Sequence, residues 1–208
     1  MFLTISILCI PAAADTVIIG GTNEENIFPF SFNYVGDYQQ VYDASAFSGA
    51  AYISEVAFFE DPVYGSGPIS GTFDIHFSTT TAGVGALSTT YGDNIGSDYA
   101  LFFSGSVSDV LSFTGTPFLY NPSVGNLLMS IYTYTGIGSH ALEAGINDPA
   151  TSRIYNLGGS LAPTADNIGL RTEFTVSAVS AVPEPTSLLL LGTGLGILWL
   201  GASRCKRK

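Results

Sequence analysis

Apolar and polar residues alternate along much of the chain between Asp15 and Ala181. In residues 71–80 (GTFDIHFSTT) the large apolar residues Phe73, Ile75 and Phe77 alternate with polar ones, and residues 169–178 (GLRTEFTVSA) repeat this period. A period of two places successive side chains on opposite faces of a strand. Both segments are therefore predicted to be strands with one buried face.

Further predicted strands are short runs rich in β-branched and aromatic residues, separated by turn-forming clusters such as YGSGPISG and YNPSVGN. These runs are residues 15–20, 28–34, 51–60, 106–115, 126–135 and 151–157. No convincing helical stripe interrupts them. Short strands at this spacing predict an all-β fold, with a single β-sandwich or jelly-roll ectodomain over residues 15–181.

The N-terminal segment has the features of a secretory signal peptide. Residues 2–10 are mostly apolar, and Ala12 and Ala14 form the small-residue pattern that a signal peptidase favours. Cleavage there would make Asp15 the new N-terminus. A positively charged start is missing, so we expect the native peptide to begin further upstream. The predicted signal peptide is residues 1–14.

A second apolar run, residues 187–202, lies near the C-terminus. As a helix of about 16 residues it would reach about 24 Å, slightly less than a hydrocarbon core of about 30 Å. Flanking residues can make up the difference, and a basic tail follows it, formed by Arg204, Lys206, Arg207 and Lys208. The pattern predicts a single-pass inner-membrane helix with the tail in the cytoplasm and the ectodomain outside.

Charge is distributed very unevenly. The ectodomain holds all 17 acidic residues except Glu184, but only two of the six basic residues, Arg153 and Arg171. So negative a field repels phosphate backbones and excludes nucleic acid as a partner. The two cysteines, Cys9 and Cys205, lie in the terminal segments. A disulfide, a cysteine-ligated zinc and a thiol nucleophile are therefore excluded within the ectodomain.

Candidate catalytic residues are few. The chain has two histidines, His76 and His140, and no G-x-S-x-G elbow. Asp74 and His76 share one strand face, but no third ligand or nucleophile accompanies them in the pattern, so we interpret both histidines as solvent-facing and predict no catalytic residue and no metal site. A glycosidase needs only two carboxylates about 5–10 Å apart, and the many acids leave that alternative open.

Two further binding functions remain open. Calcium could be held by the acidic loop YGDNIGSD, which offers Asp93, Asn94 and Asp98 outside the EF-hand register, although we predict no required cofactor. Sugar rings could stack on tyrosines. Tyr132 and Tyr134 share one strand face, while a second group, Tyr34, Tyr38 and Tyr42, lies near the N-terminus. The alternative for each tyrosine is a place in the sandwich core.

The C-terminal residues 182–208 resemble the PEP-CTERM protein-sorting signal. The order is the motif Val182-Pro183-Glu184-Pro185, then the apolar run, then the basic cluster. The resemblance implies recognition of the motif by an exosortase, a membrane enzyme that processes such proteins at the envelope of bacteria that export polysaccharide. The two prolines disfavour helix across the motif and leave it extended, as a protease requires.

Two stretches of the ectodomain also resemble PEP-CTERM proteins. They are Gln39–Phe47 and Leu111–Tyr134, the latter with GTPFLYNPSVGNLL, in which Asn121 stands where the family pattern has Asp. The family assigns them no activity. Asn121-Pro122 starts a turn, so we interpret the second stretch as a hairpin corner.

Together these features favour an exported, non-enzymatic cell-surface or matrix protein that is associated with exopolysaccharide in a biofilm. The alternatives are a secreted glycan-active hydrolase with paired carboxylates and a calcium-dependent adhesin. The expected partners are an exosortase, extracellular polysaccharide and, before processing, the membrane.

Overall fold

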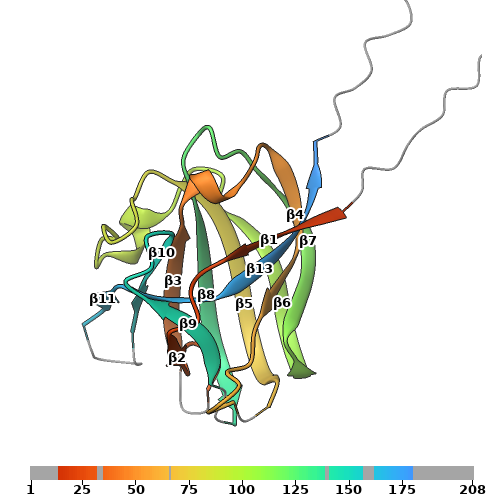
Figure 1. Ribbon diagram of the computed structural model, residues 1–208, viewed down its shortest axis with the longest axis vertical. Coiled ribbons are helices and arrows are strands. Elements are labelled where there is room, and N and C mark those ends of the chain that lie inside the picture. Colours follow the sequence, from red (N-terminus) through yellow and green to blue (C-terminus); the bar gives the residue numbers. More distant parts are fainter. Residues whose placement is uncertain (1–13, 32–34, 66, 139–140, 157–161, 180–208) are drawn as a thin grey trace, which may run out of the picture.

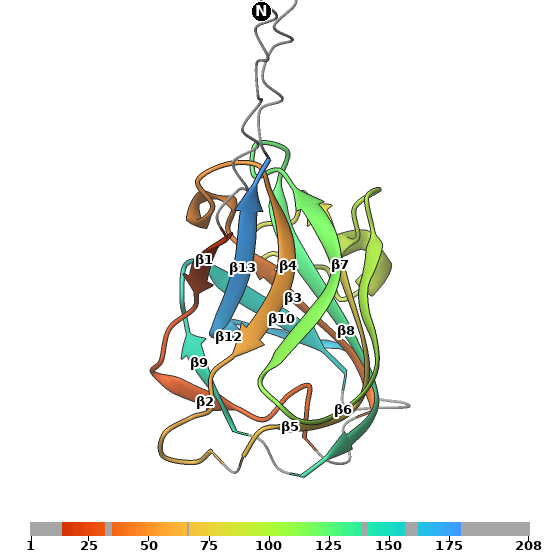
Figure 2. The same cartoon turned by 90° about the vertical axis from the view of Figure 1, so that its right-hand side faces the viewer.

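Within the part of the chain that the structure describes, strands make up the regular structure, apart from two short 3-10 turns. The computed structural model describes residues 14–31, 35–65, 67–138, 141–156 and 162–179. Within these residues two large antiparallel sheets face each other and a small third sheet lies beside them (Figures 1 and 2). The predicted all-β class is confirmed, and the facing sheets are consistent with the predicted sandwich.

The order of the strands within each sheet differs from their order along the chain. The four-stranded sheet contains, from edge to edge, β1 (Ala14–Ile19), β13 (Thr172–Ala178), β4 (Ala51–Phe58) and β7 (Ser112–Tyr120). The six-stranded sheet contains β11 (Thr164–Asp166), β10 (Thr151–Tyr155), β3 (Gly36–Tyr42), β8 (Asn126–Ile137), β5 (Ile69–Thr80) and β6 (Ala100–Val110). The small sheet contains β12 (Ile168–Leu170), β9 (Leu142–Ile146) and β2 (Glu24–Asn26). The 3-10 turns are η1 (Ala44–Ala46) and η2 (Tyr91–Asn94).

The space between the large sheets is filled mainly by aromatic rings. Phe30 is fully buried, and its ring centroid lies 4.9 Å from that of Phe58, 5.2 Å from Phe73 and 5.7 Å from Phe113. Offset and edge-on ring pairs at such distances each contribute about 0.5–1.5 kcal/mol beyond the area they bury. The alternation in β5 is the source of this core, because its odd-numbered residues 73, 75 and 77 are all buried.

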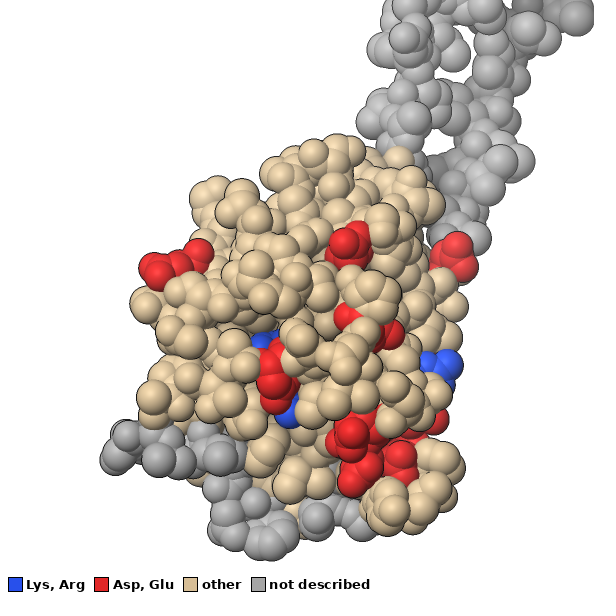
Figure 3. Space-filling view, turned by 60° about the vertical axis from the view of Figure 1, so that its left-hand side comes forward, with Lys and Arg blue, Asp and Glu red and all other residues tan. Residues whose placement is uncertain are grey.

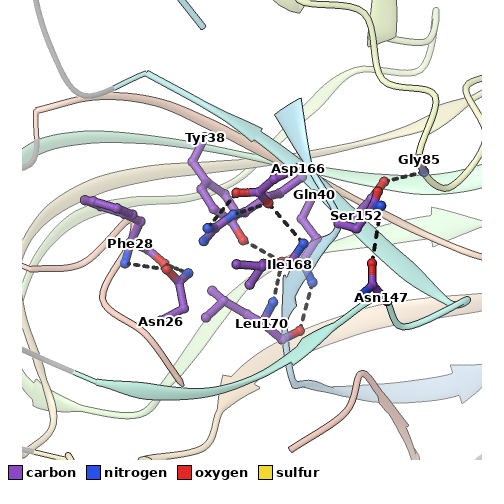
Figure 4. Close-up of polar contacts among 12 residues, drawn as sticks. Asn26, Phe28, Tyr38, Gln40, Gly85, Asn147, Ser152, Asp166, Ile168 and Leu170 are labelled. Atoms are coloured by element: carbon purple, nitrogen blue, oxygen red, sulfur yellow. Dashed lines mark hydrogen bonds and ion pairs between the residues drawn. The ribbon is translucent and has the colours of Figure 1, made fainter. Parts of the chain in front are cut away.

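A buried amide joins the six-stranded sheet to the small sheet. The side-chain oxygen of Gln40 accepts hydrogen bonds from the Tyr38 hydroxyl at 2.6 Å and the Leu170 amide at 2.8 Å. Its side-chain nitrogen donates to the Leu170 carbonyl at 2.8 Å. Figure 4 shows these three residues converging between the sheets. Buried polar groups need such partners, so Gln40 fixes how β12 lies on β3.

An ion pair lies beside this amide. Arg153 is 4% exposed, and its Nε and one terminal nitrogen donate to the two carboxylate oxygens of Asp166 at 2.8 and 3.0 Å. Asp166 also accepts from the Ile168 amide at 3.0 Å (Figure 4). The two-point geometry ties the edge strand β11 to β10.

Most predicted strands are confirmed within a few residues, and three predictions need correction. Residues 28–31 form a turn with a cis Phe28-Pro29 bond, because proline donates no hydrogen bond to a ladder. Residues 106–115 are two strands in different sheets, which meet near Asp109 at φ 56°. Residues 169–178 are divided at Arg171, whose amide donates to the Glu143 carbonyl at 2.9 Å. Strands β2, β3, β9 and β11 were not predicted at all.

The turn at Asn121 is confirmed, but it does not form a hairpin. The Asn121 carboxamide oxygen accepts from the Ser123 amide at 3.0 Å, and its carbonyl from the Val124 amide at 3.1 Å. The strands on either side, β7 and β8, belong to different sheets. The motif therefore carries the chain from one layer of the sandwich to the other.

The predicted signal peptide, apart from Ala14, and the predicted membrane helix lie outside the described residues. None of the helices within the described ranges is long and apolar enough to cross a membrane.

Replacing Gln40 by leucine tests the link between the sheets. The Gln40→Leu change keeps the volume but leaves the buried Leu170 amide without the partner described above. We expect the free energy of unfolding to fall by about 2–4 kcal/mol, as measured by urea denaturation. The exposed Thr114→Val change on β7 is the control and should shift it by less than about 0.5 kcal/mol. A loss below about 1 kcal/mol for Gln40→Leu would contradict this role.

Candidate functional site

The outer face of the six-stranded sheet, which points away from the sandwich core, is partly covered by a loop. This covering loop, residues 81–99, contains η2 and appears yellow-green in Figure 1. Beneath it, Leu87 packs with Val41, Leu128 and Ile154, which project outward from β3, β8 and β10. The loop therefore has its own small apolar core and a fixed position on the sheet.

Two buried amides hold the covering loop to the sheet. The Gln39 side-chain nitrogen donates to the Tyr91 carbonyl and to the Ser130 hydroxyl, both at 3.2 Å. The Asn94 side-chain nitrogen donates to the Gln39 side-chain oxygen at 3.0 Å and to the Ser88 carbonyl at 2.9 Å. Because these bonds span the sheet and the loop, the loop edge is a rigid wall beside the uncovered part of the face.

Exposed aromatic rings occupy the face beside this wall. Tyr99, Tyr132 and Tyr134 are 41%, 37% and 49% exposed. Tyr132 and Tyr134 meet edge to face with centroids 4.7 Å apart, and His76 stacks on Tyr99 at 4.6 Å with an angle of 2° between the rings. We call this surface the tyrosine platform; it comprises these four residues together with Asp37 and Asp74.

Two carboxylates flank the platform. Strand register places Asp37 of β3 and Asp74 of β5 opposite Tyr132 of β8, one on each side. Their Cα atoms are thus separated by two strand spacings, roughly 10 Å. The Tyr134 hydroxyl donates to an Asp74 carboxylate oxygen at 2.8 Å. One face of three adjacent strands therefore presents an aromatic centre between two acids.

The local environment changes the acidity of these groups. The Asp37 side chain is exposed, yet nearby atoms exclude enough water to raise its pKa above the usual value. Burial lowers the pKa of His76, and the nearby Asp74 carboxylate opposes that shift. The hydrogen bond to Asp74 raises the pKa of the Tyr134 phenol. At neutral pH the imidazole of His76 therefore stays neutral.

A small hollow lies between the platform and the covering loop. Its volume is about 90 Å³, and its lining includes Asp37, Gln39, His76, Tyr91, Tyr99 and Tyr132. This volume has room for a few water molecules.

The acidic loop predicted as a calcium candidate lines a separate cavity of about 450 Å³. The structure brings Asp93, Asn94 and Asp98 together there, but binds their side chains internally. The Asp98 carboxylate accepts from the Thr79 amide and hydroxyl at 2.7 and 2.6 Å, and Asp93 accepts from the Ser88 hydroxyl at 3.0 Å. Among the described residues no three His, Cys, Asp or Glu side chains are grouped to hold a metal.

The remaining sequence candidates divide clearly. Asp74 shares a strand face with His76, and Tyr132 shares one with Tyr134, as their alternation implied. Pairing of β5 with β8 brings the two pairs together. Tyr38 and Tyr42 are fully buried core residues. Tyr34 and His140 lie outside the described residues. Sequence reasoning missed Asp37, Tyr91 and Tyr99, which come from other segments. Their partnership with β8 depends on strand order, for which the sequence carries no local signal.

Acidic side chains outnumber basic ones in the described body. Figure 3 shows Asp and Glu spread over one face, on which Lys and Arg occupy small areas. The two basic residues of the described body are both paired, Arg153 with Asp166 and Arg171 with Glu143 at 2.6 Å. The net field of the body is therefore negative.

Comparison with protein families concerns the C-terminus. Residues 181–207 match the PEP-CTERM protein-sorting motif. The chain carries a PEP-CTERM sorting motif. This match contains Val182, Pro183, Glu184 and Pro185 and three of the four predicted tail residues, since Lys208 lies one residue beyond it. No curated protein and no solved structure matches the chain.

The PEP-CTERM motif follows the folded body closely. Strand β13 ends at Ala178, and the motif begins at residue 181. The β1 residue Ala14 pairs with Ser177, so the body begins and ends at the same place (Figure 2). The predicted cleavage site before Asp15 and the sorting motif are therefore attached to one end of the sandwich. Cleavage itself stays a prediction.

The depressed pKa of His76 predicts a pH effect on stability. Below about pH 6.5 the unfolded chain binds protons that folded His76 does not accept, so the free energy of unfolding falls as the pH falls. Replacing His76 by glutamine should flatten this part of the curve, as measured by denaturation at a series of pH values. His140 is present in both proteins, so the difference between the curves isolates His76. Parallel curves would contradict the assignment.

Proposed function

We propose that the protein is a non-enzymatic component of the cell surface or extracellular matrix that binds exported polysaccharide through the tyrosine platform. The observation that carries the proposal is the set of three exposed tyrosine rings, two on one sheet face and Tyr99 at the end of the covering loop beside them. Flat rings offer a large apolar contact at a low entropic cost, and phenol and carboxylate oxygens can bind sugar hydroxyls. Platforms of this kind suit a long polymer, because a chain can cross an open face.

The PEP-CTERM motif supports sorting of the protein to the cell surface by an exosortase. The proposed route begins with the signal peptide, and the inner-membrane helix of residues 187–202 then holds the exported body until processing. The body is complete at Ala178, so a protease can reach residues 182–185 without opening a strand. Pro183 and Pro185 favour an extended motif. The polysaccharide layer is then the environment of the released domain.

A glycan-active hydrolase is the second candidate, and one observation favours it. Asp37 and Asp74 flank an aromatic residue, and the raised pKa of Asp37 is the property that a general acid needs. Binding without turnover accounts better for the shallow hollow and for the hydrogen bond that occupies Asp74. The proposal requires no cofactor, and repeating the binding measurement with calcium and with a chelator tests that part.

Altering the PEP-CTERM motif should block processing. In a variant with alanine at Pro183, Glu184 and Pro185, the exosortase loses the extended segment that it recognises. We expect the protein to remain at full mass in the membrane fraction of its host, as followed by mass spectrometry. The Glu173→Gln change, which lies in the folded body, is the control and should be processed normally. Processed protein from the motif variant would contradict recognition through these residues.

Removing the platform rings should weaken polysaccharide binding. The double change Tyr132→Ala and Tyr134→Ala removes two exposed stacking surfaces. We expect at least a tenfold weaker Kd, about 1.4 kcal/mol, for exported polysaccharide from the native host, as measured by calorimetry. Tyr52→Ala is the matched control, since Tyr52 is 40% exposed on β4 of the opposite sheet. Equal losses in both proteins would contradict the platform, and release of sugar products would favour the hydrolase.

A further inference from the structure

We propose that the tyrosine platform selects glycans that carry free amino groups, such as partly de-N-acetylated amino-sugar polymers. This inference rests on the proposed function and specifies its ligand. Neutral glycans could use the rings alone. An amine-bearing glycan would in addition bring positive charge close to the carboxylates on both sides of the rings.

The first argument is the placement of charge relative to the stacking surface. Tyr132 has a carboxylate opposite it on each neighbouring strand, Asp37 on one side and Asp74 on the other. A sugar ring stacked on Tyr132 therefore directs its substituents towards one acid or the other. An ammonium group in either direction meets a carboxylate, and one above a ring gains a cation–π contact.

The second argument is that, among the described residues, neither arginine is part of the platform. The residues that line the adjoining hollow include Asp37 and His76 but neither arginine. Burial depresses the pKa of His76, so its imidazole adds no positive charge at neutral pH. Arg153 and Arg171 are paired with Asp166 and Glu143 elsewhere in the body. A uronate or sulfate ligand would be repelled by the net negative charge of the domain.

The third argument is that the Asp74 carboxylate is held in position. One of its oxygens accepts from the Tyr134 hydroxyl at 2.8 Å, and Tyr134 itself packs against Tyr132. A carboxylate can accept several hydrogen bonds, so Asp74 keeps acceptor capacity for an ammonium group while its direction is fixed. Preorganised charge of this kind favours selectivity over raw affinity.

The experiment compares matched probes on the processed protein purified from its host. The probes are a β-1,4-linked glucosamine oligosaccharide, its fully N-acetylated counterpart and an oligouronate of similar length, at a pH at which the amine is protonated. We expect the glucosamine oligomer to bind about tenfold more tightly than the acetylated one, and the uronate not to bind. Raising the salt from about 50 to about 500 mM should remove most of this preference.

Three variants separate the outcomes: the two charge variants described here and the tyrosine double variant described below. Replacing Asp37 and Asp74 together by asparagine should abolish the preference for the amine while the acetylated oligomer still binds. Glu173→Gln, on the outer face of β13 in the opposite sheet, should keep the preference. An equal loss in Glu173→Gln would show that the net charge of the domain acts alone and would overturn the inference.

The remaining outcomes distinguish this inference from the proposed function. If both oligomers bind equally and the Tyr132→Ala and Tyr134→Ala change abolishes both, the platform binds sugars but does not select amines, and this inference fails alone. If none of the probes binds and the host polysaccharide does not bind either, the proposed function fails together with it. Circular dichroism of each variant confirms that a loss of binding is not a loss of fold.

Discussion

Aromatic packing between the two large sheets is the interaction on which the rest of the structure depends. Phe30 contacts rings from β4, β5 and β7, so one side chain joins both layers. No cysteine lies between Cys9 and Cys205, so the described body has no disulfide bond to stabilise it. Its stability must come from burial of these rings and from the few buried polar bridges, such as Gln40, that set the position of the small sheet.

The same packing determines the functional face. Once Phe73, Ile75 and Phe77 point into the core, the period of a strand forces Asp74 and His76 to the other side. Ladder register then brings Asp74 and Asp37 to opposite sides of Tyr132. A slip of one residue in register would exchange the two faces of a strand. Packing of the aromatic core therefore also determines which side chains form the platform.

Strands and their buried faces could be predicted from the sequence, because they depend on neighbouring residues. The order in which the strands pair could not. Alternation correctly predicted β5 and the burial of Leu170, Thr172, Phe174 and Val176, and the density of strand-forming residues predicted β4 and β8. It could not show that residues 106–115 turn from one sheet to the other, because both halves are equally rich in strand-forming residues. The platform was half predictable in the same way. Tyr132 and Tyr134 were visible on one strand, whereas Asp37 and Tyr99 join them through strand order and the covering loop.

The position of the sorting motif follows from the topology. β13 is the last strand along the chain, but in the sheet it lies between β1 and β4. The four-stranded sheet is therefore complete only when residues 172–178 are in place. From Ala178 to the start of the predicted membrane helix at Ser187 the chain spans at most about 32 Å. In the proposed route the body is therefore held close to the membrane until processing. The motif at residues 182–185 lies beyond β13, so processing there would leave the sandwich and its platform unchanged.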